Sequence, residues 1–430
     1  MAVTGRFVVL AAAGLIPVAL LPGFGAALGW LGVMLLAVLV DLALAGSPKR
    51  LVVERDPVPA VRLGEAVDAP YVVTNGGRRR VVGVVRDAWQ PSAGVVGRSQ
   101  PIDVPAGDRR RLGTRLVPTR RGDRTVQRLV IRSFGPLRVA GRQRSLEAGG
   151  TVRVLPAFHS RRHLPSKLAR LRELDGRASV QVRGQGTEFD SLRDYVAGDD
   201  VRSIDWRATA RRQSVVVRTW RPERDRRVLL VLDTARTSAA RVGDEPRLDA
   251  AMDAALLLAA LASRAGDRVD LLALDRRVRA RVEGASRTEL LPRMVEALAP
   301  IEANLVEADW DLISSTVLSR ARRRSLVVLL TPLDAAAVEE GLLPVVPALA
   351  RRHLVLVASV ADPRVAEMAA ARGDSYAVYG AAAAERARLD RAATVAELSR
   401  LGAEVVDAEP RVLAPQLADR YLALKAAGRL

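Results

Sequence analysis

The pattern of apolar and polar positions changes along the chain, and the first change predicts a membrane hairpin. Residues 7–46 are apolar apart from Asp41, and Pro22 and Gly23 interrupt them near the middle. One helix needs about 20 apolar residues to cross the hydrocarbon core of a bilayer. The stretch is therefore long enough for two spans, and we predict a transmembrane hairpin over residues 1–49. The two predicted spans are residues 7–21 and 26–45.

Two other structures have similar apolar sequences, namely a cleaved signal peptide and a soluble core helix. The small residues "LALAG" resemble a cleavage site, but the apolar region is much longer than that of a signal peptide. Positive charge fixes the predicted orientation, since Arg6 precedes the first span, whereas Lys49, Arg50 and Arg55 follow the second. We therefore expect a two-pass protein of the cell membrane (inner or plasma) with its soluble domains in the cytoplasm.

Residues 50–157 lack helical periodicity and carry short apolar runs such as "VVGVVRDAW" and "RTVQRLVIRS", separated by Gly, Pro and Asp. This alternation is typical of short antiparallel strands, and it predicts a small β-sandwich. A basic linker over residues 158–182 follows. It contains His159 and His163 at the spacing of a zinc-binding helix, but no Glu follows the first histidine and no third ligand is near. We therefore expect these two histidines to be a surface pair and not zinc ligands.

From residue 226 to residue 430 apolar strand-like runs alternate with stretches of helical periodicity. "RRVLLVLD", "RVDLLAL", "SLVVLLT" and "HLVLVASV" are continuous apolar runs, which are typical of strands buried on both faces. The alternation predicts an α/β domain with a parallel sheet and helices on both sides. Ligands in such folds bind at the carboxyl ends of the strands. Asp233, Asp275 and Asp334 lie at or just beyond predicted strand ends.

Between these two regions, residues 183–225 contain the dense polar sequence "RGQGTEFDSLRDYVAGDDVRSIDWRATARR". An enzyme would use its acids, Glu188, Asp199, Asp200 and Asp205, as general acid or base. Flanking arginines instead favour plain ionised carboxylates, and no nucleophile with a nearby histidine is present. We expect a loop locked by Asp–Arg pairs and anchored by Phe189 and Trp206, or a docking surface for a partner. The signature and docking candidates are Gly184, Gly186, Glu188, Phe189, Arg193, Tyr195, Gly198, Asp199, Asp200, Arg202, Asp205 and Trp206.

Composition narrows the choice of partner and of chemistry. The 430 residues carry a formal net charge of +19, and the basic residues are almost all arginine. Aromatic residues make up only 3%. Scarce stacking side chains and the lack of a binding motif argue against nucleic acid, whereas the arginines suit anionic lipid headgroups. Cysteine is absent, which excludes disulfides and thiolate ligands. No phosphate-binding G-x-x-x-x-G-K-[ST] motif occurs.

The polar signature, continued through "RQSVVVRTWRPERDRRVLLVLD", closely resembles that of the bacterial domain-of-unknown-function family fifty-eight (DUF58). "TRRGDRTVQRLVIRSFGPLRVAGRQ" and "VRVLPAF" resemble the run-up to that signature. The resemblance implies a membrane hairpin, a β-rich segment and a von Willebrand factor A-like domain, here residues 226–430. It also implies a MoxR-type AAA+ ATPase as partner in chaperone-like or envelope-related remodelling, with no ATP site in this chain.

Related von Willebrand A domains hold a divalent cation with a D-x-S-x-S motif and later Thr and Asp residues. Asp233 and Thr237 match, but Ala235 replaces a hydroxyl ligand and Arg236 adds positive charge. Asp334 is a later carboxylate, shifted from the usual Thr-Asp order. The resemblance thus implies a degraded Mg²⁺ site of Asp233, Thr237 and Asp334, and a strand-end aspartate that caps the next turn remains the alternative.

Two function classes remain open from the sequence. The favoured one is a membrane-anchored, non-enzymatic interaction protein, and the other is a hydrolase that uses the carboxylates of the signature. The client, the process and the oligomeric state stay undetermined.

Overall fold

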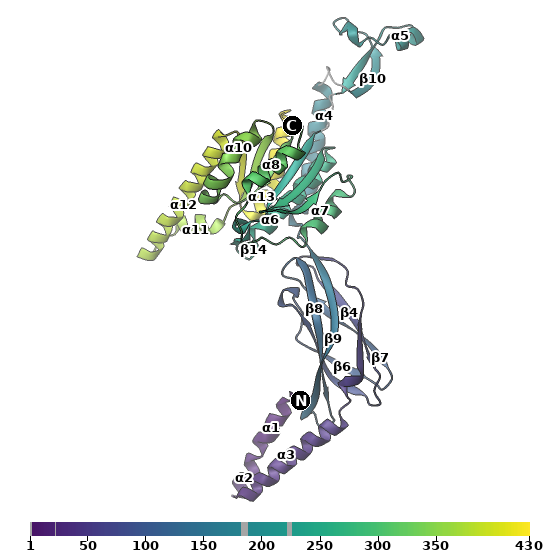
Figure 1. Ribbon diagram of the computed structural model, residues 1–430, viewed down its shortest axis with the longest axis vertical. Coiled ribbons are helices and arrows are strands. Elements are labelled where there is room, and N and C mark those ends of the chain that lie inside the picture. The colour runs from purple at the N-terminus through teal and green to yellow at the C-terminus, as the bar shows by residue number, and fades with distance from the viewer. Residues whose placement is uncertain (1, 22, 182–187, 222–225) are drawn as a thin grey trace. The chain divides into compact units, whose positions relative to one another are not determined.

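The computed structural model describes residues 2–21, 23–181, 188–221 and 226–430 (Figure 1). The chain divides into two compact units, Met1–Ala157 and Phe158–Leu430. The first contains the apolar helices and the antiparallel sheets, and the second contains the mostly parallel sheet.

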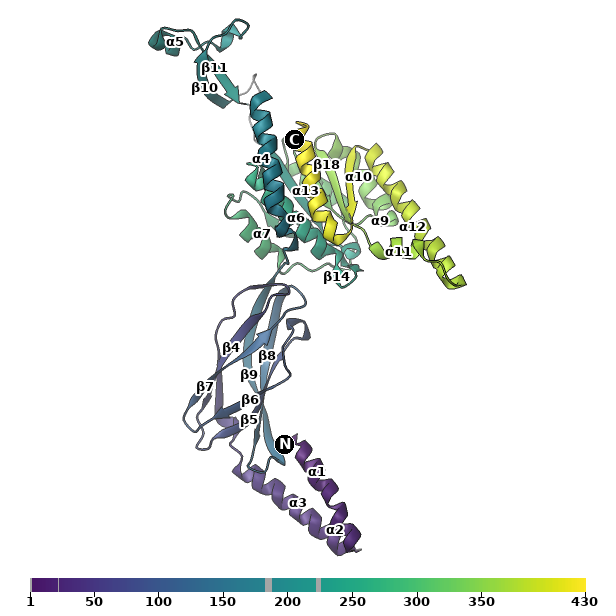
Figure 2. The same cartoon turned by 180° about the vertical axis from the view of Figure 1, so that it is seen from behind.

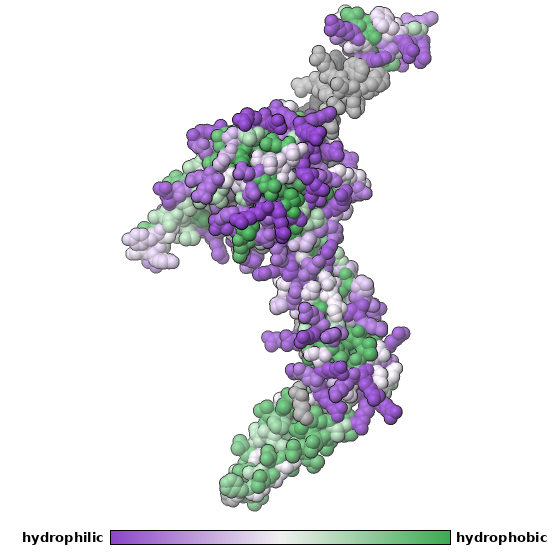
Figure 3. All heavy atoms as spheres, viewed as in Figure 1, coloured by the Kyte–Doolittle hydropathy of each residue, from purple (hydrophilic) through white to green (hydrophobic). Residues whose placement is uncertain are grey.

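The first unit begins with three apolar helices, α1 (Gly5–Ala13), α2 (Leu15–Leu20) and α3 (Phe24–Leu44). Within the described residues, one helical segment, Phe24–Arg50, is long and apolar enough to cross a membrane, and Gly5–Leu20 is a shorter apolar stretch. The side chains of α3 are largely exposed, with Leu28 at 66% and Leu31 at 62%. Figure 3 shows these helices as a continuous apolar surface. The helix long enough to cross a membrane thus corresponds to the predicted span over residues 26–45, whereas the predicted span over residues 7–21 stays a prediction.

Asp41, the one charged residue of the apolar stretch, is fully buried near the end of α3. Its carboxylate accepts hydrogen bonds from the backbone N–H groups of Leu137, Val139 and Ala140. Gly135 allows this approach, because a Cβ there would lie 2.5 Å from the backbone oxygen of Asp41. The end of the apolar helix is thus bound to the turn between β8 (Gly122–Phe134) and β9 (Ala140–Leu155). The charge of Asp41 is therefore not exposed on the surface of the helix.

Two sheets make up the rest of the first unit. One has the order β1-β9-β8-β5-β6 with β3 beside β9, and the other has the order β2-β4-β7. Both contribute to one apolar cluster, which joins Leu51 and Tyr71 to Val81 and Ile131. The strands are β1 (Ala2–Val3), β2 (Leu51–Arg55), β3 (Val61–Arg62), β4 (Val67–Asn75), β5 (Val81–Trp89), β6 (Gln100–Val104), β7 (Arg109–Leu116), β8 (Gly122–Phe134) and β9 (Ala140–Leu155), with short helices η1 (Pro48–Arg50) and η2 (Pro91–Ala93).

A buried ion pair lies between these sheets. The guanidinium of Arg55 binds the carboxylate of Asp87, and both side chains are almost inaccessible, at 6% and 2%. The indole N–H of Trp89 and the hydroxyl of Thr114 donate to the same carboxylate, at 2.7 and 2.8 Å. Arg55 therefore does not face a membrane surface, and counting it toward the orientation rule was wrong. Lys49 and Arg50 are both exposed, so these two residues still count as positive charges in the prediction of membrane orientation.

The second unit is built on a six-stranded sheet of order β16-β15-β12-β17-β18-β19. All neighbouring pairs are parallel except β15 with β16. The α/β prediction is confirmed at this level, and the antiparallel edge strand β16 was not predicted. The strands of this sheet are β12 (Arg227–Asp233), β15 (Arg268–Leu274), β16 (Val278–Val282), β17 (Leu326–Leu330), β18 (Leu354–Val360) and β19 (Ala403–Ala408). A separate two-stranded sheet consists of β13 (Arg241–Val242) and β14 (Glu245–Pro246).

Helices cover both faces of this sheet (Figures 1 and 2). On one face α8, α10 and the end of α12 enclose an apolar cluster that includes Leu229, Ile313 and Leu349. On the other face α6 packs against α13 and the strands. The helices are η5 (Arg236–Ala239), α6 (Arg247–Arg264), α7 (Leu290–Leu298), α8 (Trp310–Arg320), α9 (Ala335–Ala337), η6 (Val338–Leu342), α10 (Leu343–Ala350), α11 (Pro363–Ala370), α12 (Ser375–Arg400) and α13 (Pro410–Ala426).

The segment predicted as a linker begins the second unit and is helical, as η3 (His159–His163) and α4 (Leu164–Gln181). The backbone N–H and hydroxyl of buried Ser160 bind the carboxylate of Asp253 in α6, which fixes this segment on the helical layer. His159 is exposed, and Nε2 of His163 accepts a hydrogen bond from Arg162.

Candidate functional site

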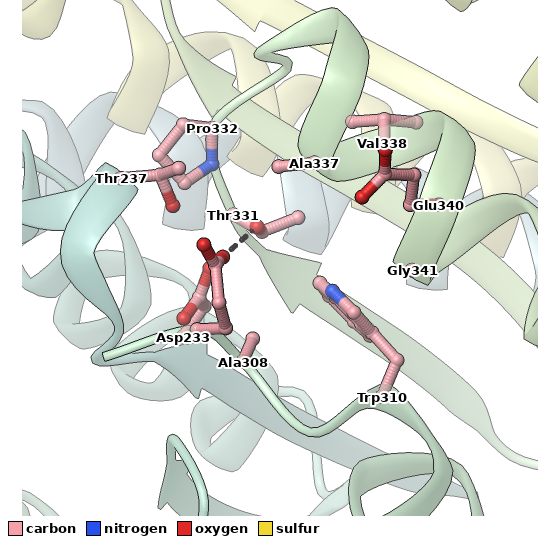
Figure 4. A pocket seen from close by; sticks show the side chains of 11 residues that line it. Asp233, Thr237, Ala308, Trp310, Thr331, Pro332, Ala337, Val338, Glu340 and Gly341 are labelled. Atoms are coloured by element: carbon pink, nitrogen blue, oxygen red, sulfur yellow. Dashed lines mark hydrogen bonds between the residues drawn. The ribbon is translucent and has the colours of Figure 1, made fainter.

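A cavity opens at the carboxyl edge of the parallel sheet, between β12 and β17. The chain leaves β12 for β15 on one side and later returns to β17 on the other, so these strands form the switch point of the sheet. Crevices at such points are the usual ligand sites of open α/β sheets. The cavity measures about 230 Å³ (Figure 4). It is lined by Asp233, Thr237, Glu307, Ala308, Trp310, Thr331, Pro332, Ala337, Val338, Glu340 and Gly341.

Asp233 ends β12 and forms one wall of the cavity, although only 3% of the residue is exposed. Its carboxylate accepts hydrogen bonds from the hydroxyl of Thr331 and the backbone N–H of Ala235, each 2.8 Å long. Burial raises the pKa of Asp233 to about 6, and these two hydrogen bonds oppose the shift. The side chain is therefore ionised at neutral pH. It has no cationic partner among the described residues.

The residues around Asp233 do not match the predicted cation site. Thr237 and Thr331 bring hydroxyl groups to the cavity, but Ala235 places a buried methyl group at the third hydroxyl position. Asp334 does not line the cavity, because its carboxylate binds the guanidinium of Arg247 at 3.2 Å. One carboxylate and two hydroxyls remain, which falls short of the ligand set implied by the resemblance. We conclude that the site does not fit Mg²⁺ as predicted.

The opposite wall is aromatic and acidic. Trp310, the first residue of α8, packs against Gly341 so closely that a Cβ at Gly341 would lie 2.3 Å from the indole ring. Gly341 belongs to η6, a turn of π-helix, and such turns are frequent at functional sites. The same turn carries Glu340, whose side chain is exposed. Figure 4 shows Trp310 and Glu340 facing Asp233 across the cavity.

The loop between α7 and α8 is held beside the cavity by Asp275. The carboxylate of Asp275 accepts hydrogen bonds from Arg279 and from the amide of Asn304, at 2.7 and 2.9 Å. Burial raises the pKa of Asp275, but the hydrogen bonds led by that of Arg279 outweigh it and the pKa lies below its ordinary value. The loop exposes Leu305 to 84%. Asp275 thus positions an apolar side chain two residues before the cavity-lining Glu307.

The signature segment forms a hairpin of β10 (Glu188–Asp194) and β11 (Val216–Arg221), with η4 (Val201–Ser203) and α5 (Trp206–Arg212) between them. Gly184 and Gly186 lie outside the described residues, as do the side chains of Glu188 and Phe189. Three predicted acids have local partners. Asp199 binds Arg193, Asp200 caps η4, and Asp205 caps α5 and pairs with Arg218.

Trp206 does not act as the predicted apolar anchor, because 67% of it is exposed. Tyr195, at 38%, and Val201, at 63%, are also exposed in this segment. Gly198 makes the turn between them with φ of +108°, a value that favours glycine. Arg202 is exposed beside them. The hairpin therefore presents aromatic and arginine side chains, the residue types that dominate protein-binding hot spots.

Of the residues that line the cavity, sequence reasoning selected Asp233 and Thr237, and those it missed include Thr331, Trp310 and Glu340. Thr331 follows the last residue of β17 directly, so its position at a strand end was a usable signal. Trp310 is the first residue of α8 and Glu340 lies within η6, and no local pattern marks either of them as part of a site. Their meeting with Asp233 depends on the packing of α8 and η6 above the sheet.

Comparisons with known proteins identify relatives without a described function. The chain is 29% identical over 189 residues to uncharacterized proteins of Mycobacterium tuberculosis and Mycobacterium bovis, and the match covers 44% of this chain. It spans 59% of the length of those relatives.

Solved structures match only weakly. A PapD-like domain of human CEP192 is 10% identical and covers 25% of this chain and 87% of its own, with a TM-score of 0.18. A CARDB domain from Pyrococcus furiosus is 16% identical and covers 24% and 94%, with a TM-score of 0.19. The model of the family described as "Protein of unknown function DUF58" matches residues 191–402, and this part of the chain, from the signature hairpin to the turn before β19, is therefore of the DUF58 family.

Proposed function

We propose that this chain is a membrane-anchored, non-enzymatic protein-interaction module that docks a partner at the carboxyl edge of its parallel sheet. The observation that carries the proposal is the cavity at Asp233. A buried, ionised carboxylate lies at the switch point of the sheet, and exposed Leu305 lies on the adjoining loop. Concave sites with a few placed polar groups and apolar neighbours are typical of recognition surfaces.

The finer architecture belongs to the same proposal. We take the second unit as von Willebrand A-like, the two antiparallel sheets as a sandwich-like domain, and α1 to α3 as a two-pass hairpin. The order of the sheet, with Asp233 at the end of its first strand, supports the first assignment. The exposed apolar side chains of α3 support the membrane anchor. Exposed Lys49 and Arg50 support a cytoplasmic location for the units that follow them.

A MoxR-type AAA+ ATPase is the proposed partner, and the proposed role is chaperone-like or envelope-related remodelling. The resemblance to the DUF58 family supports this assignment, and so does the lack of a phosphate-binding loop motif in the sequence. In this arrangement the ATPase supplies the free energy, and the membrane-anchored chain supplies the docking surfaces.

The alternative, a hydrolase that uses the signature carboxylates, is less well supported. Asp199, Asp200 and Asp205 are used as turn and helix caps or as partners of arginines. Hydrogen bonds led by that from the Ala208 backbone lower the pKa of Asp205, which keeps it from acting as a general acid near neutral pH.

Native co-purification of the full chain tests the proposal. Asp233→Asn should lose a captured ATPase because the docking charge is removed, and Trp206→Ala should weaken capture if the hairpin also contacts it. Glu339→Gln is the matched control, since Glu339 is an exposed acid one residue before Glu340 and does not line the cavity. Capture that survives both changes, or a folded chain without partners that turns over a substrate, contradicts the proposal.

A further inference from the structure

The cavity contains a buried negative charge for which the described residues supply no counter-ion. The two other strand-end carboxylates are neutralised by arginines, Asp275 by Arg279 and Asp334 by Arg247. Asp233 has only neutral donors, the Thr331 hydroxyl and the Ala235 N–H. A buried carboxylate without a cation is costly. Its retention at an open cavity therefore points to a cation from outside the chain.

The walls of the cavity favour an organic cation. The indole of Trp310 lines the cavity, and an indole ring attracts a guanidinium or ammonium group that lies over its face. Glu340 adds a second carboxylate and makes no ion pair with a described residue, whereas Glu307 is paired with Arg236. Planar guanidinium groups both stack on aromatic rings and bind carboxylates, so arginine matches this combination better than lysine.

The size of the cavity fits a single side chain. Its volume of about 230 Å³ is below the range of roughly 300–1,000 Å³ that holds drug-sized ligands. The cavity opens at the edge of the sheet, where Leu305 is 84% exposed on the loop that also supplies Glu307 and Ala308. A protein surface that inserts one side chain could therefore also contact Leu305.

We propose that this cavity receives an arginine side chain of a partner protein, with its guanidinium group between Asp233, Glu340 and the indole of Trp310. The inference deepens the proposed docking function and rests on it for the source of the arginine. It replaces the divalent cation expected from the resemblance with a monovalent organic one. This exchange agrees with the ligand set, because Ala235 and the Asp334–Arg247 pair remove two of the oxygens that a metal would use.

The test is a titration of the detergent-solubilised full chain, followed by tryptophan fluorescence. The probe is N-acetylarginine amide, its uncharged control is N-acetylcitrulline amide, and MgCl₂ at matched ionic strength is the third titrant. We expect a saturable change with the arginine probe only. Trp310→Phe should abolish the signal, which assigns it among the five tryptophans of the chain.

The variants locate the binding charge. Asp233→Asn should weaken the arginine probe about tenfold or more, because a charge-assisted contact is lost. Glu340→Gln should weaken it less, since that side chain is exposed, and Glu339→Gln should bind as the wild type does. Melting curves show whether each variant is folded. A saturable response to MgCl₂ that Asp233→Asn removes, or equal responses to the arginine and citrulline probes, overturns the inference.

The same variants separate this inference from the proposed function. If Asp233→Asn loses the arginine probe but still captures the partner, the arginine site stands and docking at this edge is wrong. If it loses the partner although the wild type never bound the arginine probe, docking stands and the arginine site is wrong.

Discussion

Asp233 and Asp275 follow neighbouring parallel strands, yet their surroundings move their pKa values in opposite directions. Asp233 is buried with two neutral donors, and burial raises its pKa to about 6. Asp275 is also buried, but the guanidinium of Arg279 and several hydrogen bonds bring its pKa below the ordinary value. The opposite shifts follow from the stronger desolvation of Asp233 together with the cationic partner that Asp275 has and Asp233 lacks among the described residues. Asp275 therefore stabilises the loop, whereas Asp233 carries a cost that a binding function would explain.

We predict that Asp233→Asn stabilises the free protein. The raised pKa means that the contribution of Asp233 is fully present below the ordinary pKa of 3.8 and is lost as pH rises through about 6. At neutral pH the ionised carboxylate therefore costs about 3 kcal/mol, which the isosteric amide avoids. Unfolding in denaturant should show this gain at pH 7.5 and almost none at pH 4. A variant that is less stable at pH 7.5 contradicts the prediction.

His353, between α10 and β18, should make stability fall in mild acid. It is buried, neither ring nitrogen has a hydrogen-bond partner among the described residues, and burial with the nearby charge of Arg352 lowers its pKa. A histidine with a lowered pKa contributes full stability above about 6.5, and this is lost as pH falls below that value. Melting temperatures from pH 7.5 to 5.5 should fall less in His353→Leu than in wild type. Replacement of exposed His159 by Gln should leave the wild-type slope.

At the scale of elements, polar contacts inside the first unit fix where its strands and helices meet. Asp41 binds the end of α3 to the turn before β9, and Gly135 leaves the space for it. Arg55 at the end of β2 and Asp87 in β5 join the two sheets through a pair enclosed by Tyr71 and Trp89. Burial raises the pKa of Tyr71 to about 12, and the negative charge of Asp87 acts in the same direction.

Breaking the Arg55–Asp87 pair should be strongly destabilising. Asp87→Ala leaves the Arg55 guanidinium buried without a counter-ion, and such losses cost about 3–5 kcal/mol. The double variant Arg55→Met with Asp87→Leu should recover much of this, because no charge then stays buried. Chemical denaturation measures both. Asp103→Ala, which breaks an exposed pair with Arg80, is the control, and its stability should be close to that of the wild type. If Asp87→Ala and Asp103→Ala lost similar amounts of stability, the prediction would be contradicted.

At the scale of the whole molecule, the chain consists of two compact units, and the apolar helices belong to the first of them. In Figure 3 the amino-terminal helices form the largest continuous apolar surface, whereas the rest of the first unit and the second unit show mostly charged and polar side chains with smaller apolar areas among them. The net charge of +19 would favour contact with anionic lipid headgroups. The candidate docking features, the cavity and the hairpin, both belong to the second unit.

Reporter fusions test the proposed two-pass topology. A reporter joined after Arg50 or at the carboxyl end should be active only on the cytoplasmic side, because Lys49 and Arg50 follow the second span. A reporter joined after Gly23 is the matched control and should be active on the outer side if residues 7–21 cross the membrane. Cytoplasmic activity at Gly23 together with outer activity at Arg50 would mean a single span of opposite orientation.

The sequence by itself determined the kinds of elements and most of their order. The runs ending at Asp233 and beginning at Leu354 are strands as predicted, because unbroken apolar stretches in an alternating pattern can only be buried between helical layers. The exact start of a helix depends on its cap, as at Ser375, where the side chain of Asp374 caps α12. The edge strand β16 was missed because its arginine-rich sequence lacks a continuous apolar run.

Only the tertiary structure decided what the candidate residues do. It brought Thr331, Trp310 and Glu340 to Asp233, and it gave Asp334 to Arg247. These contacts join residues that are tens of positions apart, so no local spacing encodes them. The pattern of apolar residues in a sequence predicts which side chains are buried, because burial follows the periodicity of helices and strands. Which charge finds a partner inside the protein depends on how the elements pack, and for Asp233 that packing left the partner to be supplied from outside.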